Sequence, residues 1–196
     1  MGRLFNLGDV ITALDAVPAR PSSDYDLNKD VVLPEGRKLR PAAVLIAVLD
    51  GQVILTKRAS TLKHHPGQIA FPGGKLEPGE TVAQAALREA QEEIGLDPAN
   101  VTVLAELPPH ETVTGYTVTP ILARVEQDFA PIVEEGEVAE CFRVPLTFLL
   151  DPANFAVEGR RWRGTRRHYY AVPYGPYYIW GATARMLKSL ADRIAA

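Results

Sequence analysis

The stretch GKLEPGETVAQAALREAQEEIGL, residues 74–96, places Glu89, Glu92 and Glu93 within five positions. A capping box at its start and a glycine stop near its end predict a helix over about 81–94. Residues four apart on a helix have Cβ atoms about 5–6 Å from each other, so Glu89 and Glu93 can share a cation. Because carboxylates repel one another, the cluster either spreads into water or is held together by positive charge.

The predicted helix is amphipathic, because its apolar residues fall on a stripe adjacent to the carboxylates. The residues expected to face the core are Ala83, Leu87, Ala90 and Ile94. Arg88 lies on the flank of the cluster, one turn from Glu92, where it can pair with a carboxylate.

Three glutamates alone would fit a solvated acidic helix face, but the preceding loop, FPGGKLEPGE, favours a site. It brings Gly73 and Gly74 to the N-terminal side of the helix, where backbone groups can approach a metal or a phosphate. Hard oxygen ligands of this kind select Mg²⁺ or Mn²⁺.

The same stretch resembles the Nudix box, G-x5-E-x7-R-E-U-x-E-E-x-G-U. The matching fixed positions are Gly74, Glu80, Arg88, Glu89, Glu92, Glu93 and Gly95. Ala90 is a mild departure, since the pattern has a bulky apolar residue there. The resemblance implies an α/β protein with the Nudix fold, a mixed β-sheet sandwiched between helices. It also implies hydrolysis of a nucleoside diphosphate linked to another moiety.

By the same resemblance, Glu89, Glu92 and Glu93 are the metal ligands, and Glu92 and Glu93 count among the catalytic residues. Glu80 and Arg88 are expected mainly to hold the loop to the helix. The sequence is therefore identified as a metal-dependent pyrophosphohydrolase that uses Mg²⁺ or Mn²⁺.

A narrower resemblance lies upstream, in ILTKRASTLKHHPGQIAFPGG, residues 54–74. It is similar to the signature of the coenzyme A pyrophosphatase branch, L-L-T-x-R-[SA]-x3-R-x3-G-x3-F-P-G-G. Lys63 replaces the second Arg, which keeps the charge but loses the bidentate fork. The resemblance implies that Arg58, Lys63, Gly73 and Gly74 bind the substrate; for the two basic residues, the alternative is ordinary surface charge.

The predicted reaction is therefore hydrolysis of the diphosphate bond of coenzyme A or its thioesters. The products would be 3′,5′-ADP and 4′-phosphopantetheine or its acyl derivative. Two alternatives stay open: the same chemistry on ADP-ribose or a dinucleotide cofactor, and a non-catalytic Nudix module that binds nucleotide or RNA.

A second acidic run, EEGEVAE, precedes a predicted strand. Nudix proteins often place a glutamate at such a point, and Glu137 is the best match for a base that takes a proton from water. Glu134, Glu135 and Glu140 are the alternatives, together with a solvated loop. No Cys or His lies near the adjacent His64 and His65 at the spacing of zinc ligands. The two histidines are therefore expected to have a role in the loop or to contact the substrate.

The whole chain is predicted to form one domain with an N-terminal addition. Residues 1–40 are expected to form a short helix, which includes Leu4, and an arm or linker; residues 41–196 are expected to form the Nudix domain, including a C-terminal helix. Asp50-Gly51 predicts a hairpin between two apolar strands, and residues 62–80 read as a long loop.

Bulk properties argue against nucleic-acid and membrane partners, while the Nudix resemblance implies a small-molecule nucleotide substrate. A net charge of −3 gives no general attraction to nucleic acid or anionic lipid. The sequence contains no apolar run of membrane-spanning length, and a single cysteine, Cys141, fits a reducing compartment, so a cytoplasmic protein is expected. The favoured interpretation of the arginine-rich segment RRWRGTRRH, residues 160–168, is a solvated hairpin tip. Phosphate binding and RNA binding are the alternatives. The oligomeric state stays open, a homodimer being one alternative.

Overall fold

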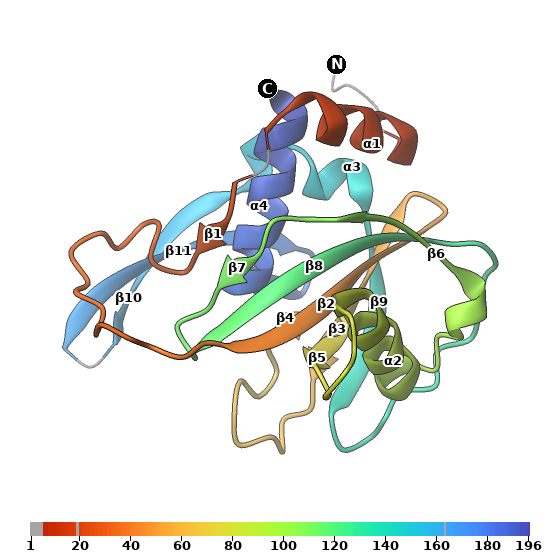
Figure 1. The fold of residues 1–196 in the computed structure, drawn as a ribbon, viewed down its shortest axis with the longest axis horizontal. Helices are drawn as coiled ribbons and strands as arrows, with labels where there is room; N and C mark the ends of the chain where they lie inside the picture. The colour runs from red at the N-terminus through yellow and green to blue at the C-terminus, as the bar shows by residue number, and fades with distance from the viewer. Residues whose placement is uncertain (1–5, 19, 163) are drawn as a thin grey trace.

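The computed structural model describes residues 6–18, 20–162 and 164–196. Leu4 and Arg163 lie outside this part, and the side chain of Trp162 is also left undescribed. The predicted α/β architecture is confirmed: a large mixed sheet has helices on both faces, and a smaller sheet projects from one end (Figure 1).

Four strands form the framework of the large sheet. β2 (Arg40–Leu49) pairs in parallel with β8 (Tyr116–Val125) and antiparallel with β3 (Gln52–Arg58), and β3 pairs with β9 (Val138–Pro145). The shorter strands are β1 (Ser22–Ser23), β4 (Ile69–Ala70), β5 (Gly73–Lys75), β6 (Val101–Glu106) and β7 (His110–Glu111). The loop predicted over 62–80 therefore contains two short strands, β4 on β3 and β5 on β2.

The hairpin between β2 and β3 forms as predicted. Asp50 and Gly51 both have positive φ, 48° and 72°, as a two-residue turn of the hairpin type requires. Asp and Gly tolerate this conformation better than most residues, so the turn fixes the register of the two strands.

Strand β2 is buried on both faces, and its alternating residues belong to two separate apolar clusters. Ala43, Leu45 and Ala47 pack in the cluster under α2 (Val82–Ile94), whereas Ile46 and Val48 pack in the cluster on the opposite face. The opposite face is covered by α1 (Leu7–Ala16), α3 (Leu146–Leu149) and α4 (Ala182–Ala195). Two short 3-10 helices complete the set, η1 (Pro98–Asn100) and η2 (Pro152–Asn154).

The small sheet consists of β10 (Ala156–Trp162), β11 (Thr165–Tyr174) and β12 (Tyr177–Trp180). The β10–β11 hairpin was predicted, but β12 was not. Val172 and Ile179 anchor this sheet in the apolar cluster beneath α4. The far part of the hairpin extends away from the large sheet (Figure 1).

The N-terminal arm is fastened to the domain by polar side chains. Asn28 accepts a hydrogen bond from the backbone N–H of His168 at 2.7 Å and donates one to its carbonyl at 2.8 Å, as a neighbouring strand would. Asp26 forms an ion pair with Arg185 of α4 at 2.6 Å. The arm is thus packed against both the small sheet and the C-terminal helix.

A buried histidine joins the arm to the large sheet. His110 is fully buried, with Nδ1 at 2.9 Å from Ser22 Oγ and Nε2 at 3.1 Å from Asp24 Oδ1. The other Asp24 oxygen accepts the backbone N–H of Val113 at 2.8 Å. These contacts place β1 beside β7, and their partners are more than 80 residues apart in sequence. None of the described helices is long and apolar enough to cross a membrane.

Candidate active site

The site begins where β5 passes beneath α2. A Cβ atom at Gly74 would lie 2.4 Å from the Cδ atom of Glu89, and one at Gly73 would lie 2.4 Å from the carbonyl oxygen of Ala43. Real Cβ atoms do not approach other atoms so closely. Gly73 therefore requires glycine, because the clash is with backbone, whereas a side chain at Gly74 would displace the Glu89 carboxylate. The pair of glycines lets the helix carboxylates rest directly on the strand backbone.

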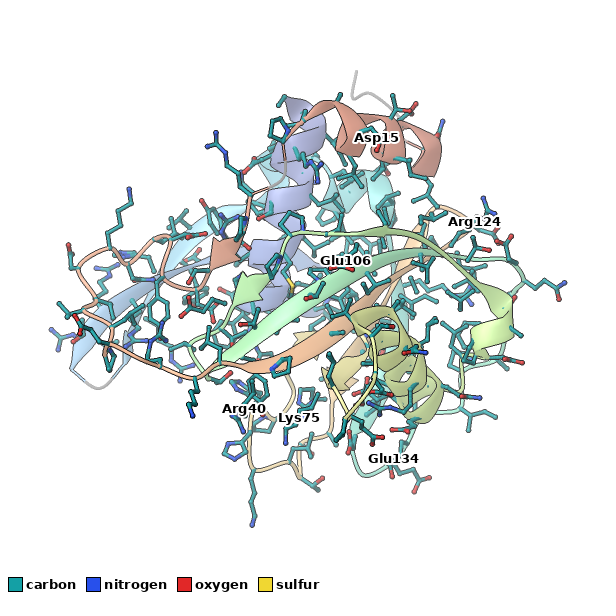
Figure 2. The ribbon with its side chains drawn as sticks, viewed as in Figure 1. Asp15, Arg40, Lys75, Glu106, Arg124 and Glu134 are labelled. Atoms are coloured by element: carbon teal, nitrogen blue, oxygen red, sulfur yellow. The ribbon has the colours of Figure 1, made fainter. Side chains whose placement is uncertain are left out.

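Arg88 ties the preceding loop to the helix. Its Nε and Nη2 atoms donate to the two carboxylate oxygens of Glu80 at 2.7 and 3.0 Å, and Nη2 also donates to the carbonyl of Lys75 at 3.1 Å. The hydrogen bonds from Arg88 lower the pKa of Glu80 to about 2, so this ion pair persists at neutral pH. Figure 2 marks Lys75 at the strand end of this connection.

The third guanidinium nitrogen of Arg88 turns toward the metal ligands predicted from the sequence. Nη1 lies 3.0 Å from Glu89 Oε1 and 3.3 Å from Glu92 Oε2. The Glu92 side chain is 60% exposed, whereas that of Glu89 is 17% exposed. Burial raises the pKa of Glu89, against the opposing effect of Arg88.

Glu93 lies deeper than the helical pattern predicted. It is 5% exposed and belongs to the buried face of α2 together with Ala85, Ala86 and Ala90. Of the predicted apolar stripe, Ala90 and Ile94 are buried, and Ala83 and Leu87 are partly buried but pack against the same cluster. Short alanine side chains allow the helix to approach the sheet, and the carboxylate of Glu93 then accepts the backbone N–H of Gly73 at 3.3 Å.

The environment of Glu93 fits a divalent cation. Burial, which has the largest effect, together with the negative charges of Glu89 and Glu137, raises its pKa to about 8, although the N–H of Gly73 and the charge of Arg58 act in the opposite direction. A buried carboxylate is costly without a positive partner, and adjacent hard oxygen donors are the ligands that Mg²⁺ and Mn²⁺ prefer. Glu89, Glu92 and Glu93 are therefore the residues that would hold the ion.

The ligand set is only partly preassembled. Among residues 6–18, 20–162 and 164–196, no group of three carboxylate, imidazole or thiol side chains already surrounds one point. Arg88 holds Glu89 and Glu92 to one side, and Glu92 is exposed enough to rotate toward Glu93.

Glu137 comes from the segment that closes the C-terminal end of α2. The backbone N–H groups of Ile132 and Glu134 donate to the carbonyls of Ile94 and Glu93 at 3.1 and 3.0 Å. The carbonyl of Glu137 in turn accepts the N–H of Ala59 at 2.8 Å. This path brings the charge of Glu137 close enough to raise the pKa of both Glu89 and Glu93.

The other acidic candidates lie differently. Glu140 accepts a hydrogen bond from the Tyr177 hydroxyl, and Tyr177 stacks on Phe142 in the cluster beneath α4, on the opposite face of the sheet. Glu134, in the loop next to α2 (Figure 2), is exposed, as are Glu135 and Glu137, but of these three only Glu137 is among the charges that raise the pKa of Glu89 and Glu93. Of the four glutamates considered, Glu137 remains the candidate base.

Arg58 ends strand β3 at the mouth of the site. Its charge lowers the pKa of Glu93, and its backbone bonds to Gln68 and Gly67 close the loop that carries Lys63. The Nε atom of Arg58 is buried and has no hydrogen-bond partner in the described part of the chain. Lys63 is exposed.

His65 is a feature of this loop that the sequence did not predict. Its φ of 55° is in the left-handed region, although it is not glycine. Partial desolvation, reinforced by the charges of Arg58 and His64, lowers the pKa of its imidazole. His64 and His65 are both exposed, and no signal in the sequence predicted the left-handed backbone of His65.

A cavity of about 510 Å³ lies elsewhere, between the arm, α4 and Leu107. Two of its three arginines are engaged within the protein: Arg185 pairs with Asp26, and Arg193 donates to carbonyls at the end of α1, whereas Arg20 is exposed. The carboxylates of α2, which lie outside this cavity, remain the candidate site.

Comparisons with known proteins agree with this geometry. Residues 38–163 match the NUDIX domain family. The chain is 39% identical over 159 residues to the uncharacterized Nudix hydrolase NudL of Cronobacter sakazakii, covering 79% of this chain and 83% of the relative. The NudL protein of Klebsiella pneumoniae is 33% identical over 198 residues, 99% of this chain and 97% of its own length.

The chain belongs to the Nudix hydrolase family. A solved structure of a MutT/nudix family protein from Enterococcus faecalis shares the fold, with a TM-score of 0.51 and 15% identity over 98% of this chain and 71% of that one. Nudix hydrolases generally use divalent metal ions and act on small-molecule nucleotide substrates. The match contains the whole Nudix box, Arg58 and Glu137.

Proposed function

We propose that this Nudix hydrolase cleaves the diphosphate bond of coenzyme A or its thioesters with Mg²⁺ or Mn²⁺. The observation that carries the hydrolytic assignment is the seating of Glu89 and Glu93 on the backbone of Gly74 and Gly73. The substrate rests on the resemblance of residues 54–74 to the coenzyme A pyrophosphatase signature.

The bound ion would neutralise the diphosphate and make a nearby water more acidic. Glu89, Glu92 and Glu93 would hold it, and the N–H of Gly73 fixes the orientation of Glu93. Glu137 would take the proton of the attacking water as the water oxygen bonds to phosphorus and the bridging P–O bond breaks. The bridging oxygen leaves with the departing phosphate group.

Arg58 and Lys63 would bind the substrate phosphates. The charge of Arg58 acts on Glu93, and the buried Nε atom of Arg58 has no hydrogen-bond partner in the described part of the chain. Lys63 is exposed on the same loop, so it can reach a part of the substrate that extends from the metal. An ammonium at this position acts as a point charge, which predicts less orientational selectivity than an arginine would give.

The test is hydrolysis of coenzyme A, ADP-ribose and NADH side by side, with Mg²⁺ or Mn²⁺, and with products separated by chromatography. Formation of 3′,5′-ADP that stops on adding a chelator is the expected result. Cleavage of ADP-ribose or NADH with coenzyme A untouched would retain the hydrolase assignment and overturn the substrate. Absence of turnover with either metal, together with tight RNA binding, would instead favour a non-catalytic module.

A further inference from the structure

Strand β10 forms an open edge of the small sheet. It pairs only with β11 within the described residues, and residues 156–161 are all exposed. Its outer row of backbone N–H and C=O groups is therefore available to another strand. Natural proteins usually cover or interrupt such an edge, because it is a template for pairing with a second chain.

Strand β10 carries charged side chains, but among the described residues it lacks the proline, the bulge and the covering segment that commonly block edge pairing. The register with β11 runs through seven consecutive pairs, from Ala156↔Ala171 to Trp162↔Thr165, without a bulge. The strand contains no proline, and Val157 on it is 55% exposed. Because the hairpin extends from the body of the molecule (Figure 1), a second chain can approach this edge.

The sequence of the strand is complementary to itself. In AVEGRR, residues 156–161, glutamate and arginine stand on either side of Gly159. If two copies of β10 run antiparallel about a two-fold axis at Gly159, Glu158 of one copy lies opposite Arg160 of the other. We propose that the chain forms a two-fold symmetric dimer through this pairing of β10 with β10.

The charges support this register. Directly opposed residues in an antiparallel pair have Cβ atoms about 4.5–5.5 Å apart, close enough for an ion pair, and symmetry creates each pair twice. Neither Glu158 nor Arg160 forms an ion pair within the described part of one chain. A shift by two residues, the next register that keeps the same backbone groups facing the partner, would place Arg160 opposite Arg160 or Glu158 opposite Glu158.

The exposed edge and the charges of β10 fit a second copy of the chain better than they fit nucleic acid. The arginines of the described hairpin, Arg160, Arg161, Arg166 and Arg167, would attract a phosphate backbone, but only a second copy of β10 gives Glu158 an opposite charge as its partner. The dimer would join the two small sheets into one continuous sheet, with β12 at each outer edge. A ribbon interface of this kind is small, so the dimer is expected to dissociate on dilution.

Sedimentation across a protein concentration series tests the pairing. Wild type is expected to approach twice the 21.4 kDa chain mass at high concentration. Glu158→Arg or Arg160→Glu alone places like charges opposite each other twice, and each should raise the dissociation constant at least roughly tenfold. The double variant E158R/R160E restores opposite charges and should recover the dimer.

Lys38→Glu is the matched control, because Lys38 is exposed and the substitution changes the net charge as much as R160E does. It should leave the dissociation constant unchanged. A wild-type chain that stays monomeric at every concentration overturns the proposal, whether or not it binds RNA. So does a dimer that both single reversals leave intact, or single-variant losses that the double variant fails to recover.

Discussion

The two faces of the large sheet bury different chemistry under their helices. On the α2 face, Ala43 and Ala47 of β2 accept a helix rich in alanine, which carries the buried carboxylate of Glu93. On the α4 face, Ile46 meets larger side chains such as Leu187 and Leu190. Small residues bring a charged helix close to the backbone at an energetic cost, while the larger apolar cluster supplies stability. The same strands therefore serve a reactive face and a stabilising face.

The largest effect should come from Glu93→Gln. Loss of this carboxylate as a metal ligand should reduce kcat at least about a hundredfold, roughly 2.7 kcal/mol of barrier. Thermal stability should stay equal or rise, because a carboxyl group whose pKa burial raises to about 8 disfavours the folded state at neutral pH. Steady-state kinetics and a melting curve measure both, with Glu106→Gln on β6 as the control (Figure 2). Retention of more than about a tenth of wild-type turnover would remove Glu93 from catalysis.

Gly74→Ala tests the close approach of strand and helix on the α2 face. The new methyl group would meet the Glu89 carboxylate at 2.4 Å and displace it, so kcat should fall roughly 10–100-fold. Gly79→Ala is the control in the same loop: open space surrounds it but its φ is 88°, so it should cost stability and leave turnover unchanged. Equal turnover in the two variants would contradict the role of the contact.

Leu187→Ala tests the opposite face. Leu187 is fully buried, and its truncation should lower the free energy of unfolding by about 2–5 kcal/mol. Turnover per folded molecule should stay within about twofold of wild type, because the change lies on the far side of the sheet from Glu93. Denaturant titration measures the change in stability, and kinetics at a temperature well below the melting point measure turnover separately. A fall in kcat of the size expected for Glu93→Gln would show that the faces are coupled.

The smallest effect concerns the tie between Glu80 and Arg88. The pKa of Glu80 is about 2 in the folded protein, below the 4.5 of a free carboxyl group, so its stabilising contribution is present above pH 4.5 and lost as pH falls toward 2. Glu80→Gln should therefore be less stable than wild type at neutral pH, with a difference that narrows over this acidic range. Melting temperatures against pH provide the measurement; a constant difference would argue against an ionic tie.

Short sequence motifs predicted the helix boundaries and the hairpin turn on the α2 face of the sheet. The capping box of Thr81 and Gln84 forms, Gly95 ends α2 with a φ of 70°, and Asp50-Gly51 makes the hairpin. Each of these depends on neighbours a few residues away, which is why sequence alone reveals them.

Features that depend on distant partners were not predictable. β4 and β12 are too short for a periodic pattern, and Asn28 meets His168 across 140 positions. The depth of Glu93 was missed for the same reason: a helical pattern gives the direction of a side chain but not how closely the helix approaches the sheet.

The parallel pairing of β2 with β8 also sets an order of assembly. Residue 40 pairs with residue 116, 76 positions later, and the hairpin, the loop of Arg58 and all of α2 lie between them. Closing so long a segment delays the central ladder relative to the local turns. During synthesis, the carboxylate-bearing helix leaves the ribosome after β2 and β5, on which it mainly packs, and before β8, so the sheet beneath it is complete only once β8 emerges.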